Sequence, residues 1–243
     1  MALAYPDSLK ASAAVCALSR SPVRVGAMSP LPILYSFRRC PYAMRARMAI
    51  WASGTTVSLR EVVLRHKPAA LIEASPKATV PVLVLSNGTV IEESLAIIDW
   101  ALEQNDPNSW CDASLETAAL INACDGDFKG WLDKYKYADR HPEQSAVYYR
   151  EQAEEFIGDL EQRLSAQRWL GGERATRADV AVFPFVRQFA GVDPTWWLDA
   201  PYPTVRTWLN DWLVSDTFTG VMAKYPPWQP DEPEVMFAKS SGR

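Results

Sequence analysis

The sequence is poor in histidine and cysteine, and this excludes several kinds of chemistry. Only two histidines and four cysteines occur in 243 residues. No two cysteines have the C-x-x-C spacing, so neither a dithiol redox motif nor a disulfide framework is indicated. His66 and His141 share no ligand-like spacing with each other or with a cysteine, and we therefore expect no metal site. This cysteine usage favours a reducing compartment, and we expect the protein in the cytoplasm.

An excess of positive charge and long apolar runs are also lacking. The formal net charge is -4 at pH 7. A general binder of nucleic acid or of anionic membranes needs a clustered positive surface, so both classes are excluded. No apolar run approaches the roughly 20 residues that span a bilayer. With 48% hydrophobic and 22% charged residues, the chain has the composition of a globular protein with one large domain or two modest ones.

The first part of the chain differs in composition from the rest. Residues 1–30 are rich in alanine and serine, and they carry three basic residues against one acidic residue. Such a segment can be a transit-type leader, a weak secretory signal, or a disordered extension that precedes a true start at Met28. We favour the last interpretation and expect residues 1–30 to lie outside the fold.

Residues 31–105 alternate short strand-like and helix-like segments. The apolar run LPILYSF precedes a helix that starts at Pro41 and ends near Ser53, with Gly54 as its stop signal. The strand-like run TVSLREVVL, the short helix AALIEA, a hairpin around an Asn-Gly pair and the helix ESLAIIDWALEQ follow in that order. The order β-α-β-α-β-β-α combines a parallel crossover with an antiparallel hairpin. It predicts an α/β thioredoxin-like N-terminal domain.

The remainder of the chain is predicted to be an all-α C-terminal domain over residues 113–225, after a linker at 106–112. Eight of the ten tryptophans lie beyond residue 105, and such side chains bury large areas between helices. Thr176 and Asp179 have the spacing of a capping box, which marks the start of a helix. We expect the proline-rich and acidic residues 226–243 to form a loose tail.

Cys40 stands between the first predicted strand and the helix that starts at Pro41. A proline in the first helical turn places this thiol at the N-terminal end of the helix. There the unpaired amides and the helix dipole stabilise a thiolate, and Arg38 and Arg39 add positive charge nearby. We therefore predict a reactive Cys40 thiol with a pKa below its ordinary value. The alternative, an inert cysteine that only fills space, suits the other three cysteines better.

The motifs CPYA, TVPVL and IEES follow one another on this predicted domain, and an all-helical partner comes after them. In order and spacing they resemble the cytosolic glutathione transferases, specifically the cysteine-containing omega-like and bacterial branch. The resemblance covers the chain from residue 31 to about residue 225. It implies the glutathione transferase architecture, glutathione as co-substrate, small thiol or electrophile substrates, no metal, and a cytoplasmic homodimer.

The resemblance also assigns roles to residues of this chain. Cys40 takes the place of the catalytic thiol that faces the glutathione sulfur. Pro81 takes the place of the proline that the family holds in the cis form. The main chain of Val80 would then pair with the cysteinyl backbone of glutathione, as a one-residue strand addition.

Three further residues are assigned to the two ends of glutathione by the same resemblance. Glu93 would pair with the γ-glutamyl amine. Ser94 and nearby amides at a helix N-terminus would bind the γ-glutamyl carboxylate. Lys67 would reach the glycyl carboxylate, so that charges of both signs face a zwitterionic tripeptide.

A cysteine at the catalytic position favours thiol exchange over conjugation. It can form a mixed disulfide with glutathione, which suits deglutathionylation or the reduction of an acceptor such as dehydroascorbate. Position 43 is alanine, so a second glutathione would have to resolve that disulfide. Conjugation of glutathione to electrophiles, a non-catalytic transferase-like interaction protein and a hydrolase built from Cys40 and His66 are the alternatives.

The acceptor pocket is expected between the Cys40 loop and the predicted helix over residues 115–137. Trp131, Tyr135 and Tyr137 can line such a pocket, but their spacing fits core packing equally well.

Overall fold

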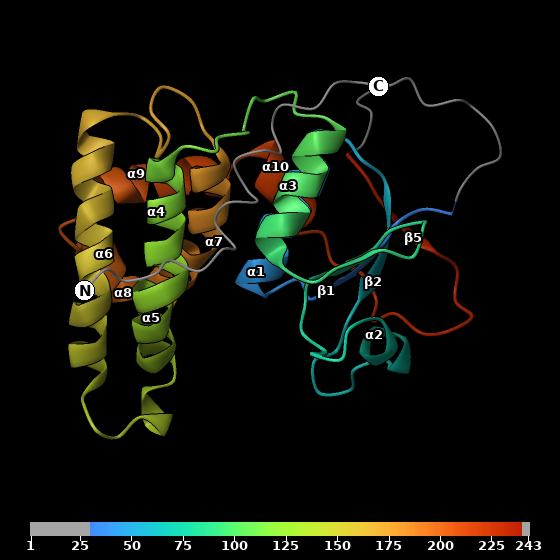
Figure 1. The fold of residues 1–243 in the computed structure, drawn as a ribbon. Helices are drawn as coiled ribbons and strands as arrows, with labels where there is room; N and C mark the ends of the chain where they lie inside the picture. Colours follow the sequence, from blue (N-terminus) through green and yellow to red (C-terminus); the bar gives the residue numbers. More distant parts are fainter. Residues whose placement is uncertain (1–29, 240–243) are drawn as a thin grey trace, which may run out of the picture.

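The fold is taken from a computed structural model, which describes residues 30–239. A sheet domain lies on the right of Figure 1 and a helical domain on the left. The expectation that residues 1–30 lie outside the fold falls almost entirely on residues outside the described range.

The sheet domain contains the predicted elements in the predicted order. They are β1 (Ile33–Ser36), α1 (Pro41–Ser53), β2 (Val57–Glu61), α2 (Ala69–Ala74), β3 (Val82–Val84), β4 (Val90–Ile91) and α3 (Ser94–Gln104). The strands are arranged as β4-β3-β1-β2-β5, where β5 comes from the end of the chain. β1 is parallel to β2 and antiparallel to β3, and β3 is antiparallel to β4. The predicted thioredoxin-like sheet is confirmed.

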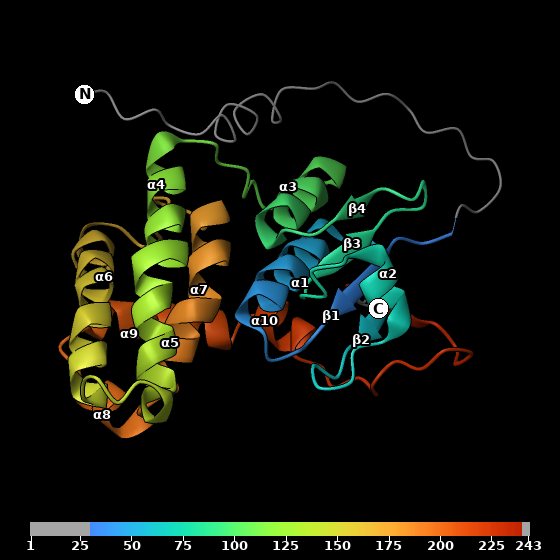
Figure 2. The same ribbon diagram turned by 60° about the horizontal axis from the view of Figure 1, so that its bottom comes forward.

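The two faces of the sheet contact different layers of helices. Successive side chains of a strand point to opposite faces. Leu34 of β1 and Leu83 of β3 therefore join the large core that includes α1 and α3. Tyr35 of β1 and Val82 of β3 join a smaller cluster with Leu71 of α2 on the other face. Figure 2 shows α1 and α3 on one side of the strands and α2 on the other.

Helix α1 has the bounds that its sequence predicts. Cys40 is the extended N-cap residue with φ -76° and ψ 124°, and Pro41 begins the helix. Gly54 ends it in the left-handed conformation with φ 71°, and its N–H donates to the Trp51 carbonyl. Nearly all residues of α1 are buried, including Arg45. This helix therefore packs on every side, with the sheet and α3 on one side and the helical domain on the other.

The helical domain follows a linker and is stabilised by a buried carboxylate. Its helices are α4 (Leu115–Ala123), a π-helical turn (Cys124–Phe128), α5 (Lys129–Lys136), a short 3-10 turn (Ala138–Arg140), α6 (Ala146–Ala166), α7 (Arg177–Ala190), α8 (Pro194–Asp199), α9 (Pro203–Leu213) and α10 (Asp216–Val221). The predicted capping box of Thr176 and Asp179 is present at the start of α7. Asp179 also accepts hydrogen bonds from the Leu170 amide and the Trp208 indole, both at 2.9 Å. One carboxylate thus joins α7, the preceding loop and α9.

Two arginine–aspartate pairs join the domains. The Arg177 guanidinium on α7 donates to both carboxylate oxygens of Asp99 on α3, at 2.7 and 2.9 Å. Arg45 on α1 donates to Asp125 in the π-helical turn at 2.6 Å. Bidentate and charge-assisted bonds of this kind fix orientation as well as distance. The relative placement of the sheet and the helices is therefore set at two separate points.

The segment from Pro226 onward differs from the loose tail that the sequence analysis expected. The Trp228 amide donates to the Glu61 carbonyl, and β5 (Val235–Phe237) pairs antiparallel with β2. Phe237 is fully buried in the main core. Without β5, β2 would be an edge strand with unpaired backbone groups. The strand is too short for its alternation to be recognised among prolines and acidic residues.

We expect the Phe237→Ala substitution to lower the free energy of unfolding by about 3–5 kcal/mol, the range for a fully buried phenylalanine. Urea unfolding followed by tryptophan fluorescence measures this change. The control is Met236→Ala on the same strand, where the side chain is 54% exposed, and where we expect a change within about 0.5 kcal/mol. Equal small effects from both substitutions would show that β5 is not part of the cooperative fold.

Candidate functional site

Cys40 lies against the main chain of Val80. The half-buried thiol donates a hydrogen bond to the Val80 carbonyl, with 3.7 Å between the sulfur and the oxygen. The Val80–Pro81 peptide bond is cis, as the resemblance implies. The strand-to-helix turn after β1 and the turn before β3 thus bring three of the predicted site residues together.

The thiol pKa differs from the sequence-based expectation. Burial raises the pKa of Cys40, and this effect outweighs the amides of Ala43 and Tyr42, which lower it. Those amides belong to the first turn of α1, so the predicted stabilisation by the helix N-terminus exists. It is smaller than the cost of moving the charged form out of water. The prediction of a lowered thiol pKa is therefore wrong.

The cations that act on the thiol are not the ones that precede it in the sequence. After the amides, the positive charges of Lys129 and Arg45 lower the Cys40 pKa. The Arg39 guanidinium instead lies over the Phe37 ring, 5.4 Å from its centroid. Lys129 comes from α5 in the helical domain. Only the tertiary structure brings it to the thiol.

Arg45 is buried near Cys40, where α1 packs against the helical domain. Its guanidinium lies 5.0 Å from the centroid of Tyr42 and 4.6 Å from that of Phe185, and it is paired with Asp125. Stacking on aromatic rings offsets part of the cost of a buried cation. Burial, together with the charge of Asp125, raises the pKa of Tyr42 to about 12. The Tyr42 phenol is therefore neutral at physiological pH.

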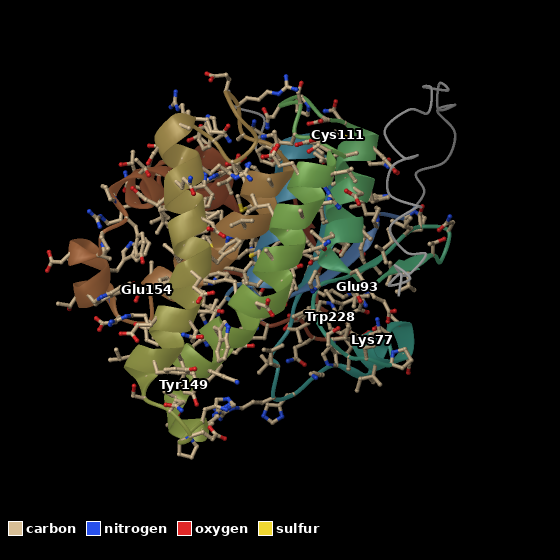
Figure 3. The ribbon with its side chains drawn as sticks, turned by 60° about the vertical axis from the view of Figure 1, so that its left-hand side comes forward. Lys77, Glu93, Cys111, Tyr149, Glu154 and Trp228 are labelled. Carbon is tan, nitrogen blue, oxygen red and sulfur yellow. The ribbon has the colours of Figure 1, made fainter. Side chains whose placement is uncertain are left out.

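Glu93 and Ser94 lie at the N-terminal end of α3. Ser94 is the first helical residue and is buried, whereas Glu93 is 73% exposed and stands at the N-cap. Lys77 forms an ion pair with Glu93 at 3.0 Å, and Figure 3 shows both side chains beside α2 and the start of α3. The sequence analysis missed Lys77. In the sequence, only its position three residues before Val80 indicates that Lys77 belongs to the site. A single lysine is weak evidence for a functional role.

The structure does not place Lys67 in contact with the rest of the site. This side chain is exposed, and it makes no hydrogen bond or ion pair with another side chain within residues 30–239. Its assignment to the glycyl carboxylate stays a prediction. In the same range, no group of three or more His, Cys, Asp or Glu side chains is placed to hold a metal ion.

Two sequence profiles of one family match this chain. The N-terminal domain of glutathione S-transferase matches residues 34–110, and the C-terminal domain of glutathione S-transferase matches residues 117–211. A probable glutathione transferase of Aplysia californica is 42% identical over 71 residues, which are 29% of this chain and 75% of that protein. The chain belongs to the glutathione S-transferase family.

The branch within the glutathione S-transferase family is less closely defined. The omega-1 transferase of Rattus norvegicus is 22% identical over 182 residues, which cover 72% of this chain and 74% of the relative. A glutathione transferase family member from Pseudomonas fluorescens, solved with two glutathione molecules bound, has a TM-score of 0.69 at 19% identity. That match covers 81% of this chain and 94% of the other. The likeness confirms the predicted fold, a thioredoxin-like domain with a helical partner.

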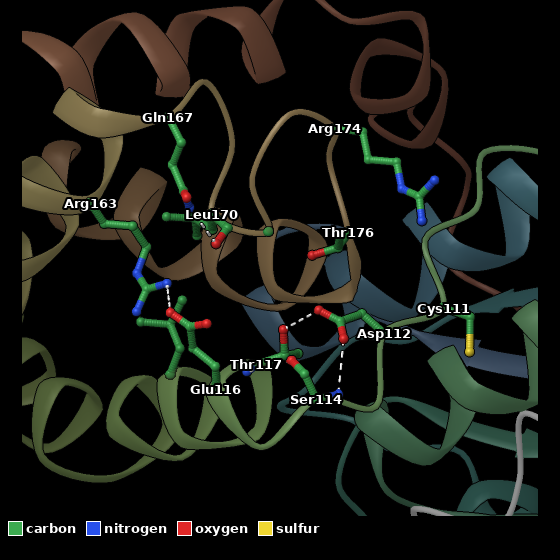
Figure 4. A pocket seen from close by; sticks show the side chains of 12 residues that line it. Cys111, Asp112, Ser114, Glu116, Thr117, Arg163, Gln167, Leu170, Arg174 and Thr176 are labelled. Atoms are coloured by element: carbon green, nitrogen blue, oxygen red, sulfur yellow. Dashed lines mark hydrogen bonds and ion pairs between the residues drawn. The ribbon is translucent and has the colours of Figure 1, made fainter.

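We describe two of the cavities in the described part of this transferase-family protein. One, of about 660 Å³, is lined by Arg39 and Pro41, the two neighbours of Cys40, and by residues of α5, α7, α8 and α9. The other, of about 370 Å³, lies between the start of α4, the end of α6 and the loop before α7. Figure 4 shows its polar side chains, among them Asp112, Arg163 and Arg174. None of the predicted site residues lines the second cavity.

The aromatic residues considered for the acceptor pocket lie in the core of the helical domain or beside it. Tyr135 is buried and packs against Phe189, with 5.6 Å between the ring centroids. Trp131 stacks on Tyr149 at 6.4 Å. Neither of these two residues, nor Tyr137, lines either cavity. No helix within residues 30–239 is long and apolar enough to cross a membrane.

We expect Cys40 to be alkylated slowly by iodoacetamide at pH 7, with a rate that rises with pH through and above the ordinary thiol pKa of about 8.5. A raised pKa leaves little thiolate at neutral pH. The alkylation rate is therefore low there and increases as the pH rises. Mass spectrometry of the peptide that contains Cys40 measures the rate between acidic and alkaline pH.

Lys129→Met should move this profile to higher pH, because it removes a positive charge that favours the thiolate. Lys134→Met on the same helix is the matched control, since that ammonium lies over the Trp131 ring instead. A midpoint below the reference value in the unliganded protein would contradict the burial argument.

Proposed function

We propose that this protein binds glutathione and uses Cys40 for glutathione-dependent thiol transfer, that is, for deglutathionylation or for reduction of small acceptors. The observation that carries this proposal is the contact between the Cys40 thiol and the Val80 carbonyl, beside a cis proline. It sets a nucleophile next to the main chain that precedes β3, which can pair with a peptide. The structural relatives solved with glutathione or oxidised glutathione support the choice of this tripeptide.

The proposed binding site lies between the turn before β3 and the N-terminal end of α3. The backbone of Val80 pairs with the cysteinyl residue of glutathione. Ser94 and the first amides of α3 bind the γ-glutamyl carboxylate, because a helix N-terminus favours an anion. Glu93 receives the γ-glutamyl amine and exchanges its bond to Lys77 for this one. Lys67 remains the proposed partner of the glycyl carboxylate.

In this proposal, glutathione binding and activation of the Cys40 thiol both involve the carbonyl oxygen of Val80. In the unliganded protein, the Cys40 thiol donates to the Val80 carbonyl, which stabilises the protonated form. A peptide N–H that takes this carbonyl removes that stabilisation. The amides of Tyr42 and Ala43 and the charge of Lys129 then favour the thiolate. Occupancy of the site would therefore remove one interaction that favours the protonated Cys40 thiol.

The proposed reaction has two thiol-exchange steps. The Cys40 thiolate attacks the glutathionyl sulfur of a mixed disulfide, and the acceptor leaves as its thiolate. A second glutathione thiolate then attacks the Cys40–glutathione disulfide, releases oxidised glutathione and restores Cys40. Ala43 supplies no thiol at the resolving position, which is why a second glutathione is needed.

The alternatives receive less support. Conjugation to electrophiles needs a donor to a glutathione thiolate, and Cys40 is a weaker donor than a hydroxyl. A hydrolase built on Cys40 and His66 needs contact between them, but the thiol bonds to Val80 and His66 is exposed. A homodimer in the cytoplasm belongs to the same proposal, and sedimentation equilibrium tests the dimer.

We expect Cys40→Ala to abolish turnover of a glutathione mixed disulfide while glutathione still binds, because the anchoring groups lie elsewhere. A coupled assay of oxidised glutathione formation gives the turnover, and calorimetry gives the binding. Cys124→Ala is the matched control, since Cys124 is fully buried and burial raises its pKa. Normal exchange by Cys40→Ala would rule out the proposed mechanism.

We expect Ser94→Ala to weaken glutathione binding by about 1–3 kcal/mol, the range for a hydrogen bond to a charged group. The melting temperature should change little, and calorimetry supplies the affinity. Ser86→Ala, at an exposed position in the β3–β4 turn, is the control. If both variants bind glutathione as the wild type does, the γ-glutamyl group is held elsewhere.

A further inference from the structure

A carboxylate from the neighbouring strand holds the turn that precedes Cys40. Within this turn, the Cys40 amide donates to the Phe37 carbonyl at 2.9 Å. The Arg38 amide donates to the Glu61 carboxylate at 2.7 Å. Glu61 is the last residue of β2 and lies opposite Ser36, the last residue of β1. Because the two strands are parallel, the end of β2 lies beside the start of the turn.

The other oxygen of this carboxylate faces a buried cation. The Arg47 guanidinium on α1 lies 3.4 Å from Glu61, and the Arg47 side chain is only 1% exposed. Arg47 forms no other ion pair within residues 30–239, and an unpaired buried charge is costly. Burial raises the pKa of Glu61, whereas the Arg38 amide and the charge of Arg47 lower it. The two carboxylate oxygens therefore serve two different donors.

The end of the chain fixes the backbone of Glu61. The Trp228 amide donates to the Glu61 carbonyl at 2.8 Å. The Arg60 guanidinium lies over the Trp228 ring, 4.2 Å from its centroid, and β5 pairs with β2 a few residues away. The main chain of Glu61 is thus held independently of its side chain. This makes the carboxylate a fixed point against which the turn can be set.

We propose that Glu61 is a positioning residue for Cys40: its carboxylate fixes the turn between β1 and α1 and thereby holds the thiol beside the Val80 carbonyl. Glu61 acts through the Arg38 amide and not through contact with the thiol, which bonds to Val80. The proposal rests on the thiol-transfer function of Cys40 and adds a residue outside the contacts named for it. Exchange requires the attacking sulfur to be aligned with the disulfide bond, and a misplacement of about 1 Å can cost about 100-fold in rate.

Glu61→Gln tests this arrangement, because an amide has one acceptor oxygen where a carboxylate has two. The variant can accept from the Arg38 amide or from the Arg47 guanidinium, but not from both. The buried guanidinium competes for the single oxygen, and we expect the turn to lose its fixed position.

The first measurement is the alkylation of Cys40 by iodoacetamide, followed by mass spectrometry. Burial is the largest influence on the Cys40 pKa and raises it, and a loosened turn admits water to the thiol. We therefore expect Glu61→Gln to be alkylated about threefold faster at pH 7, the effect of a pKa lowered by roughly half a unit. Glu73→Gln, at an exposed position on α2, is the matched control and should keep the wild-type rate.

Labelling of the buried Cys124 in the same samples reports global unfolding. We expect it to stay at the wild-type level in Glu61→Gln. An unchanged Cys40 rate in that variant, or an equal gain in the labelling of Cys124, would overturn the proposal.

A double variant separates the Arg38 bond from the ion pair. Arg47→Met removes the competing donor, and methionine suits the two aromatic rings that lie near the guanidinium. When Arg47→Met and Glu61→Gln are combined, the amide oxygen is free to accept from Arg38, and we expect the wild-type alkylation rate of Cys40 to return. Replacing both members of a buried ion pair costs less than removing one, so this variant also serves if Glu61→Gln alone does not fold. A double variant with the defect of Glu61→Gln would contradict the proposed role of the Arg38 bond.

Turnover of a glutathione mixed disulfide connects the position of the thiol to the proposed reaction. The substrate is the mixed disulfide of glutathione and mercaptoethanol. We expect Glu61→Gln to lower kcat by at least about tenfold, while KM changes by less than about twofold, because the proposed glutathione contacts lie elsewhere. Calorimetry should show an unchanged number of glutathione sites, whereas partial unfolding would reduce it.

The two measurements keep this proposal apart from the proposed function. An unchanged kcat in Glu61→Gln, or a rise in KM alone, would refute the positioning role and leave thiol transfer standing. If the wild type turns over no mixed disulfide, the thiol-transfer function fails. The alkylation rates then decide by themselves whether Glu61 positions the thiol.

Discussion

The burial of α1 on every side is the constraint on which the rest of this structure depends. The helix contacts the sheet and α3 on one side and α7 and α10 on the other, and it contains two arginines that are almost fully buried. Each of these needs a partner, since an unpaired buried charge is costly. Arg45 takes Asp125 from the helical domain. Arg47 takes Glu61 from β2 and lies over Tyr225 and Phe237 near the end of the chain.

The same burial sets the chemistry of Cys40. A helix that starts inside a domain junction offers its first amides to the thiol but also removes water from it. The two effects act in opposite directions on the pKa, and desolvation is the larger one in the unliganded protein. Burial therefore keeps the thiol mostly protonated at neutral pH.

The two sides of the site are built from different parts of the fold. The proposed glutathione side uses short segments of the sheet domain, where Val80 and Ser94 are held by the ends of β3 and α3. The helical domain contributes Lys129 of α5, whose positive charge acts on the Cys40 thiol.

The sequence alone was sufficient for the order of strands and helices from β1 to α3, the start of α1 at Pro41 and the capping box of α7, because these depend on local periodicity and on caps. It also pointed to Cys40 and to the Val80–Pro81 pair through motif order. It could not give the thiol pKa, since burial and the charge of Lys129 come from another domain. The pairing of β5 with β2 and the placement of Glu61 beside Arg38 and Arg47 were likewise decided by tertiary structure. These groups are far apart in the chain, and only long-range packing brings them together.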